Sequence, residues 1–347
     1  MGKKLTFILL SLIIFLGCNT NEIKDVQLSP SFYYWKTSFQ PSTEELNLLE
    51  KTGAELLYIR FFDIDWKAGS GAVPVAQLDV DSLPLFHQNI IPVIFITNRT
   101  MKNIAPKDIS RLAENILKKV NYIARKFPNT YHEIQLDCDW TEGSKDHFFE
   151  LIRQVKNQTK GKGISISSTL RLHQYRYPKK TGVPPVEKVM LMFYNMGEVA
   201  DLSESNSILN LAKAKPYIEG ASTYPIPLDI AVPIFSWGAL FRDGKLINLI
   251  KGMEAIELKD SLRFLQKDSL HFEVKKGTYL NGIYLYQGDQ IRLESISKAL
   301  LFKTVPLLQQ VLNQQKTRIA FYHLDSSIQK EFSNETIRQF LSQISSQ

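Results

Sequence analysis

The sequence lacks the short motifs that mark several common enzyme classes. It has no Gly-x-Ser-x-Gly elbow, which excludes a serine hydrolase of that type, and no phosphate-binding loop. No glycine-rich turn follows the first predicted strand, which argues against an open dinucleotide-binding sheet. The histidines show no metal-ligand spacing, so we expect no metal and no other cofactor. The net charge of +7 comes without a Lys/Arg tract with interleaved aromatics, so we expect no nucleic-acid partner.

Long apolar runs are also scarce, and the one at the N-terminus has the shape of an export signal. Lys3 and Lys4 precede an apolar run that covers 5–16, which is short for a membrane span. The residues 15–18, Phe-Leu-Gly-Cys, resemble the lipobox of bacterial lipoproteins, which implies cleavage before Cys18 and acylation of its thiol with a palmitate-type chain. A simple signal peptide or anchor is the alternative.

The export signal leads to predictions about the location of the protein and about its second cysteine. We predict a signal peptide over 1–17, a tether over 18–30, and a protein held at the membrane of the bacterial cell envelope by the lipid on Cys18. Cys138, the second of two cysteines, then has no partner for an intramolecular disulfide. We expect it to pack as a small apolar group, and we expect the protein to be a monomer.

Alternating strand and helix patterns fill the rest of the chain. Eight strands are predicted to start near Ser31, Ala54, Asn89, His132, Gly163, Lys188, Ile230 and Arg318, mostly separated by helices or loops. This number and spacing predict a single (β/α)8 TIM-like barrel over 31–347. Tight-turn signals at Asp243-Gly244 and Asn281-Gly282 predict a small β-containing insertion over 239–290, after the seventh strand.

The stretch 133–140 alternates polar and apolar residues, and its polar face is predicted to be the centre of a site. Asp137 and Asp139 would lie on one face, roughly 7 Å apart along the strand. Two carboxylates this close and partly desolvated raise one pKa, which creates an acid and base pair. The alternatives are a solvated edge strand, or structural acids paired with Arg60 or Arg171.

In a barrel of this kind, function lies at the carboxyl ends of the strands. Polar and aromatic residues gather there, and carboxylates surrounded by aromatic rings suit a sugar ligand. We therefore predict carbohydrate-binding roles for Tyr34, Trp35, Arg60, Asp63, Asp65, Trp140, Arg171, Asn195 and Trp237.

The stretch from His132 to Trp140, the serine-rich strand over 163–170 and the run over 189–194 are similar to glycoside hydrolase family 18 barrels. That family has a D-x-D-x-E run and a Met-x-Tyr motif; Asp137 and Asp139 match the two aspartates and Tyr194 the tyrosine. The resemblance implies attack by the acetamido oxygen of the substrate, with the glutamate as acid. That glutamate falls at Thr141, and Glu142 follows one position later. Asn195 stands where the family has an aspartate.

The chain also looks like a family of uncharacterised bacterial exported proteins with glycosidase-like barrels, through the stretches 136–139, 192–197 and 232–238. Two hypotheses follow. The first is an envelope lipoprotein that hydrolyses a glycan, with Asp137, Asp139, Glu142 and Tyr194 as catalytic residues. The second is a non-catalytic protein on the same barrel that binds a glycan or another envelope component.

Overall fold

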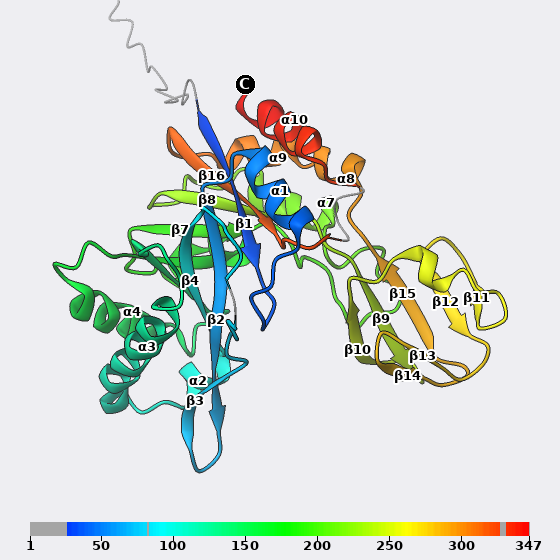
Figure 1. The fold of residues 1–347 in the computed structure, drawn as a ribbon, viewed down its shortest axis with the longest axis horizontal. Coiled ribbons are helices and arrows are strands. Elements are labelled where there is room, and N and C mark those ends of the chain that lie inside the picture. The colour runs from blue at the N-terminus through cyan, green and yellow to red at the C-terminus, as the bar shows by residue number, and fades with distance from the viewer. Residues whose placement is uncertain (1–25, 82, 327–330, 347) are drawn as a thin grey trace, which may run out of the picture.

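The computed structural model describes residues 26–81, 83–326 and 331–346. The predicted signal peptide and Cys18 lie outside the described residues. Parallel strands form a closed barrel, because the first strand pairs with both the second and the last (Figure 1). In chain order, which is also the order around the barrel, its strands are β1 (Gln27–Tyr34), β2 (Leu56–Lys67), β4 (Asn89–Ile96), β5 (Glu133–Asp137), β6 (Ser165–Arg171), β7 (Lys188–Met192), β8 (Leu228–Pro233) and β16 (Lys316–Tyr322). This confirms the predicted TIM-like fold.

The first barrel strand begins earlier than the sequence pattern indicated. The predicted tether ended at residue 30, but β1 already pairs with β16 from Gln27 onward. Backbone hydrogen bonds to a neighbouring strand stabilise this segment although its side chains are mostly polar. The tether boundary is therefore corrected to before residue 27.

Helices surround the barrel, and local sequence explains where they start and stop. In the first of them, Ser42 and Glu45 form a reciprocal capping box, and Gly53 ends the helix at φ 73°. None of the helices in the described residues is long and apolar enough to cross a membrane. The helices are α1 (Thr43–Thr52), α2 (Asn98–Asn103), η1 (Pro106–Asp108), α3 (Ile109–Ala124), α4 (Lys145–Thr159), α5 (Leu172–Arg176), α6 (Pro178–Thr181), α7 (Leu211–Ile218), α8 (Lys298–Phe302), α9 (Val305–Val311) and α10 (Asn334–Ser345).

Strand β2 continues past the barrel and turns back as an antiparallel hairpin with β3 (Gly71–Val75). In Figure 1 this hairpin extends away from the barrel at the bottom of the view. The residues at the end of β2 are therefore carried away from the barrel axis.

A second, antiparallel sheet follows β8 and lies to one side of the barrel, opposite α3 and α4 (Figure 1). It has its own apolar core, which includes Leu240, Ile250 and Phe264. Its strands span 237–294, a few residues more at each end than the predicted 239–290. They are β9 (Trp237–Arg242), β10 (Lys245–Lys251), β11 (Phe264–Gln266), β12 (His271–Val274) and β15 (Gln290–Glu294); a separate hairpin of β13 (Thr278–Leu280) and β14 (Ile283–Leu285) and the short helix η2 (Ala255–Leu258) complete the insertion.

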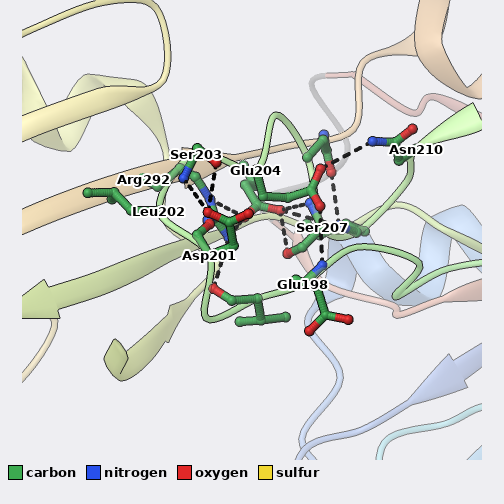
Figure 2. A network of polar contacts seen from close by, with 12 residues as sticks. Glu198, Asp201, Leu202, Ser203, Glu204, Ser207, Asn210 and Arg292 are labelled. Atoms are coloured by element: carbon green, nitrogen blue, oxygen red, sulfur yellow. Dashed lines mark hydrogen bonds and ion pairs between the residues drawn. The ribbon is translucent and has the colours of Figure 1, made fainter. Parts of the chain in front are cut away.

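A buried polar network joins this insertion to the loop between β7 and α7 (Figure 2). Arg292 and Glu294 are both fully buried and form an ion pair. Arg292 donates to the carbonyls of Val199, at 3.1 Å, and Asp201, while Glu294 accepts from the backbone and hydroxyl of Ser207. Because these groups would be unsatisfied if the parts separated, the network fixes the insertion against the barrel.

Candidate active cleft

The inner face of β5 carries polar side chains with two kinds of surroundings. Toward its amino end, Glu133 accepts from Arg318 and from the hydroxyl of Ser167, both at 2.6 Å. Gln135 accepts from the hydroxyl of Tyr33 at 2.6 Å. These contacts lie inside the barrel and pair the Glu133 carboxylate and the Gln135 carbonyl, although Gln135 Nε2 has no partner among the described residues. We interpret this half of the strand as structural.

Toward the carboxyl end, Asp137 and Asp139 line an open cavity of about 220 Å³. Asp137 is 5% exposed and accepts from Thr169 Oγ1 at 2.7 Å. Burial, with a further contribution from the charge of Asp139, raises the pKa of Asp137 to about 7. Asp139 is exposed, and its carboxylate lies 3.6 Å from Arg171 Nε. The cleft thus holds one carboxyl group that retains a proton near neutral pH beside an accessible one.

Aromatic side chains form the wall beside this carboxyl pair. Tyr194 stacks on Tyr322 with ring centroids 5.0 Å apart, and Trp35 packs 5.6 Å from Tyr322. All three line the cavity that holds Asp137. Burial, and next the neighbouring Tyr322, raise the pKa of Tyr194, so its hydroxyl remains a hydrogen-bond donor.

A larger cavity of about 430 Å³ adjoins the first and shares Trp35, Arg60, Asn195 and Tyr322 with it. Phe235 and Trp237 add further ring surface. Within the described residues, Trp237 Nε1 and Asn195 Oδ1 are buried polar atoms without a hydrogen-bond partner. Unpaired polar groups beside a cavity are typical of a site that a ligand completes.

A β-bulge positions Arg60. The register between β2 and β4 shifts between Arg60 and Phe62, which places Arg60 and Asp63 on one side of the strand. Arg60 Nε donates to Asp63 Oδ1 at 2.7 Å, and a second guanidinium nitrogen donates to the other oxygen. Arg60 lines both cavities, and these two hydrogen bonds from its guanidinium to Asp63 fix its position.

Asp63, predicted to bind sugar, lines neither cavity, and three further residues with that prediction also lie elsewhere. Tyr34 is fully buried and donates to the carbonyl of Ser38. Trp140 is fully buried, and its Nε1 donates to the carbonyl of Thr181. Asp65 lies on the part of β2 that extends past the barrel, where it pairs with Arg99 outside both cavities. These three assignments are wrong, because no face of either ring is open to a ligand and Asp65 lies past the barrel mouth.

Glu142 also lies outside the cleft. It is exposed in the turn that precedes α4 and lines neither cavity, so it is not placed to protonate a ligand there. Thr141, at the position of the family's glutamate, is exposed and hydrogen-bonded through its backbone to Ser144. The catalytic assignment of Glu142 is corrected accordingly.

The alternation along each strand already contained the signal for two of these corrections. Asp137 and Asp139 face inward, so alternation turns Cys138 and Trp140 away from the cleft, and both are buried. In the same way, Tyr33 faces the barrel interior, so Tyr34, the next residue, faces away from it. The prediction treated every polar or aromatic residue near a strand end as facing the mouth.

Tyr322 and Lys251 are cleft residues that the prediction missed. Tyr322 ends β16 one residue before His323, so strand alternation could have identified it. Lys251 ends β10 of the insertion, and no local pattern shows that this strand reaches the barrel mouth. In the described part of the chain, no group of His, Cys, Asp and Glu side chains is arranged to hold a metal ion.

The barrel fold of this protein is similar to that of several solved structures. The spore cortex-lytic enzyme SleL of Bacillus megaterium QM B1551 is similar over 92% of this chain and 74% of its own, with a TM-score of 0.54 and 13% identity. SleL of Bacillus cereus gives a TM-score of 0.52 at 15% identity, over 92% and 75% of the two chains. A chitinase from Chromobacterium violaceum ATCC 12472 gives 0.51 at 11% identity, over 90% and 99%.

At such low identity these similarities concern the fold. No protein-family model matches the sequence, and no curated protein matches it either. Activity must therefore be argued from the cleft itself.

Proposed function

We propose that this protein hydrolyses a glycan that contains N-acetylated amino sugars, with the Asp137 and Asp139 pair as its acid and base. The observation that carries the proposal is the pKa of Asp137, raised to about 7 beside the accessible Asp139 in an aromatic-walled cleft. Asp137 therefore holds a proton near neutral pH, next to an accessible carboxylate that a ligand can reach. The chitinase and the cortex-lytic enzymes with the same fold support a substrate of this class.

The chemical step follows from the accessibility of the two groups. Asp139, the accessible member of the pair, passes the proton held by Asp137 to the glycosidic oxygen as the bond from that oxygen to C1 breaks. The acetamido oxygen of the same sugar forms the new bond to C1. Water then attacks C1 as the bond from the acetamido oxygen to C1 breaks, and its proton returns through Asp139 to Asp137, which restores the acid. Tyr194 donates a hydrogen bond that orients the acetamido group.

Asp139→Asn tests this mechanism. We expect hydrolysis of N-acetylglucosamine oligomers or peptidoglycan strands to fall by about a hundredfold or more, because general acid catalysis contributes roughly 10²–10⁴-fold. Glycan binding, measured by calorimetry, should remain within about twofold, since the amide keeps the shape of the carboxylate. Glu142→Gln is the matched control and should retain full activity. Equal activity of Asp139→Asn and the parent protein would contradict the mechanism.

A second function, glycan binding without hydrolysis, is favoured by one observation. The position of the family's acid holds Thr141, and Glu142 points outside the cleft. If the protein only binds glycans, the parent protein should bind the same oligomers but hydrolyse none of them, so no new reducing ends should appear. The parent protein's own hydrolysis therefore separates the two functions before any variant is made.

We also propose that the protein works at the bacterial cell envelope, held by a lipid on Cys18. The sequence support is the lipobox-like run that ends at Cys18. Cys18→Ser should move the protein from the membrane fraction to the soluble fraction of an expressing bacterium. Retention of the variant in the membrane fraction would refute lipid anchoring.

A further inference from the structure

The larger cavity carries more positive than negative charge. Lys36, Arg60 and Lys251 line it, against the single carboxylate of Asp325. Desolvation, and next the charge of Arg171, lower the pKa of His173, which lies in α5 and lines neither cavity. Burial likewise lowers the pKa of His323, which lines this cavity and is neutral there. The cavity therefore offers cations to whatever occupies it.

Three of the cleft cations have acidic partners, and Lys251 does not. Lys36 pairs with Glu45 at 2.7 Å, Arg60 pairs with Asp63, and Arg171 lies 3.6 Å from Asp139. Among the described residues, Lys251 forms no ion pair and no side-chain hydrogen bond, although it lines both cavities. Its positive charge is thus the one left uncompensated at the cleft.

The electrostatics of Lys251 agree with this position. Desolvation of the amine, and then the nearby charge of Arg60, lower the pKa of Lys251, and Asp63 only partly offsets them. A cation whose charged form is disfavoured by another cation lies in a locally positive field. An anionic group placed between the two would be attracted to both.

The insertion holds Lys251 in place. Lys251 pairs directly with Trp237 across β10 and β9, and the amide of Gly252 donates to the carbonyl of Ser236 at 2.9 Å. Arg292 and Glu294, on the strand next to β9, anchor the same sheet to the β7–α7 loop (Figure 2). The amine therefore belongs to a sheet that is fixed relative to the carboxyl pair.

We propose that the larger cavity binds a sugar that carries a carboxylate, and that Lys251, with Arg60, selects this acidic sugar over a neutral one. Trp35 and Trp237 provide the ring surfaces on which the sugar lies, and the carboxylate reaches the two cations at the rim. This inference rests on the proposed glycan function and narrows it to acidic glycans. It assigns to the insertion the role of choosing the substrate.

The test compares matched oligosaccharides. One series alternates N-acetylglucosamine with glucuronic acid and a second alternates it with N-acetylmuramic acid free of peptide; each is also prepared with its carboxyl groups reduced to alcohols. Affinities are measured by calorimetry in the Asp139→Asn background, so that cleavage does not interfere. We expect at least one acidic series to bind about tenfold more tightly than its reduced form, as a charged hydrogen bond contributes. The series that shows the preference identifies the source of the carboxylate.

Lys251→Gln should remove this preference by weakening binding of the acidic series about tenfold while leaving the reduced series unchanged. Lys245→Gln, at the exposed start of the same strand and outside both cavities, is the matched control and should retain the preference. Equal binding of acidic and reduced oligomers by the parent would overturn this inference and leave the glycan function standing. Absence of binding to all of them, with no hydrolysis, would overturn both.

Discussion

Carboxylate side chains face the barrel interior at both ends of strand β5, but their hydrogen-bond and ion-pair partners differ between the two ends. At the amino end, Glu133 has Arg318 and Ser167 as close partners. At the carboxyl end, Asp137 has the single hydroxyl of Thr169, and Asp139 has a cation at 3.6 Å. The ion pair and hydrogen bond at Glu133 make the first half structural, whereas the weaker pairing of Asp137 leaves the second half able to exchange protons.

The largest expected effect concerns the structural half. Arg318→Met leaves Glu133 without its cation and Tyr58 without a donor. Removal of one partner from a buried pair costs about 3–5 kcal/mol, so we expect the free energy of unfolding to fall by about this amount in urea titrations. Lys316→Met, at the exposed start of the same strand, is the control and should change it by less than about 0.5 kcal/mol. A loss below about 1 kcal/mol in Arg318→Met would mean that the pairing at the base is not structural.

The next effect concerns the pH dependence of stability. Because the pKa of Asp137 is about 7 in the folded protein and near 3.8 when unperturbed, the folded state binds the extra proton between these values. Stability from this group is therefore present below about pH 4 and is lost as the pH rises to about 7, by about 4 kcal/mol at most. Asp137→Asn lacks this dependence, so urea unfolding of both proteins at pH 4, 5.5 and 7.5 should show the parent losing stability relative to the variant. Parallel stability curves would show that Asp137 is ionised throughout.

The smallest effect compares two hydroxyl donors on β6. Thr169→Val and Ser167→Ala each remove one hydrogen bond to a carboxylate of β5 and should each cost about 1–2 kcal/mol of stability. The Thr169 hydroxyl lowers the pKa of Asp137, so its loss should move the pH profile of hydrolysis upward. Ser167→Ala should leave that profile in place, since Arg318 still holds Glu133. A shift of the profile in both variants, or in neither, would remove the functional distinction between the two halves of β5.

Much of the fold could be predicted from local patterns. The strand at Asn89–Ile96 is a continuous apolar run, and α3 has apolar residues at helical spacing, so each element type follows from its own residues. The predicted boundaries shifted where pairing rather than composition decides. Examples are the start of β1 at Gln27, and Trp237, where β9 begins two residues before the predicted insertion. Hydrogen bonds to a distant strand leave no local trace in the sequence.

For the candidate site, the sequence located the strand and the two aspartates but not their surroundings. Trp35, Arg60, Arg171, Tyr194, Asn195 and Trp237 do line the cavities, and their roles in catalysis or binding stay predictions. The predictions for Tyr34 and Trp140 were wrong because a step of one residue along a strand moves a side chain from the barrel mouth to the core. Lys251 could not be predicted as a cleft residue, because its strand belongs to an insertion whose position depends on contacts with residues more than forty positions away.

The sequence by itself determined the eightfold alternation of strands, the polar inner face of β5 and the order of Asp137 and Asp139 on it, because these follow from periodicity along one segment. The tertiary structure alone decided which polar groups find partners. Arg318 reaches Glu133 across the barrel from 185 positions away, and nothing of equal strength reaches Asp137. Burial inside the closed barrel is the main cause of the raised pKa of Asp137, and that burial comes from the closure of the barrel rather than from a local pattern in the chain.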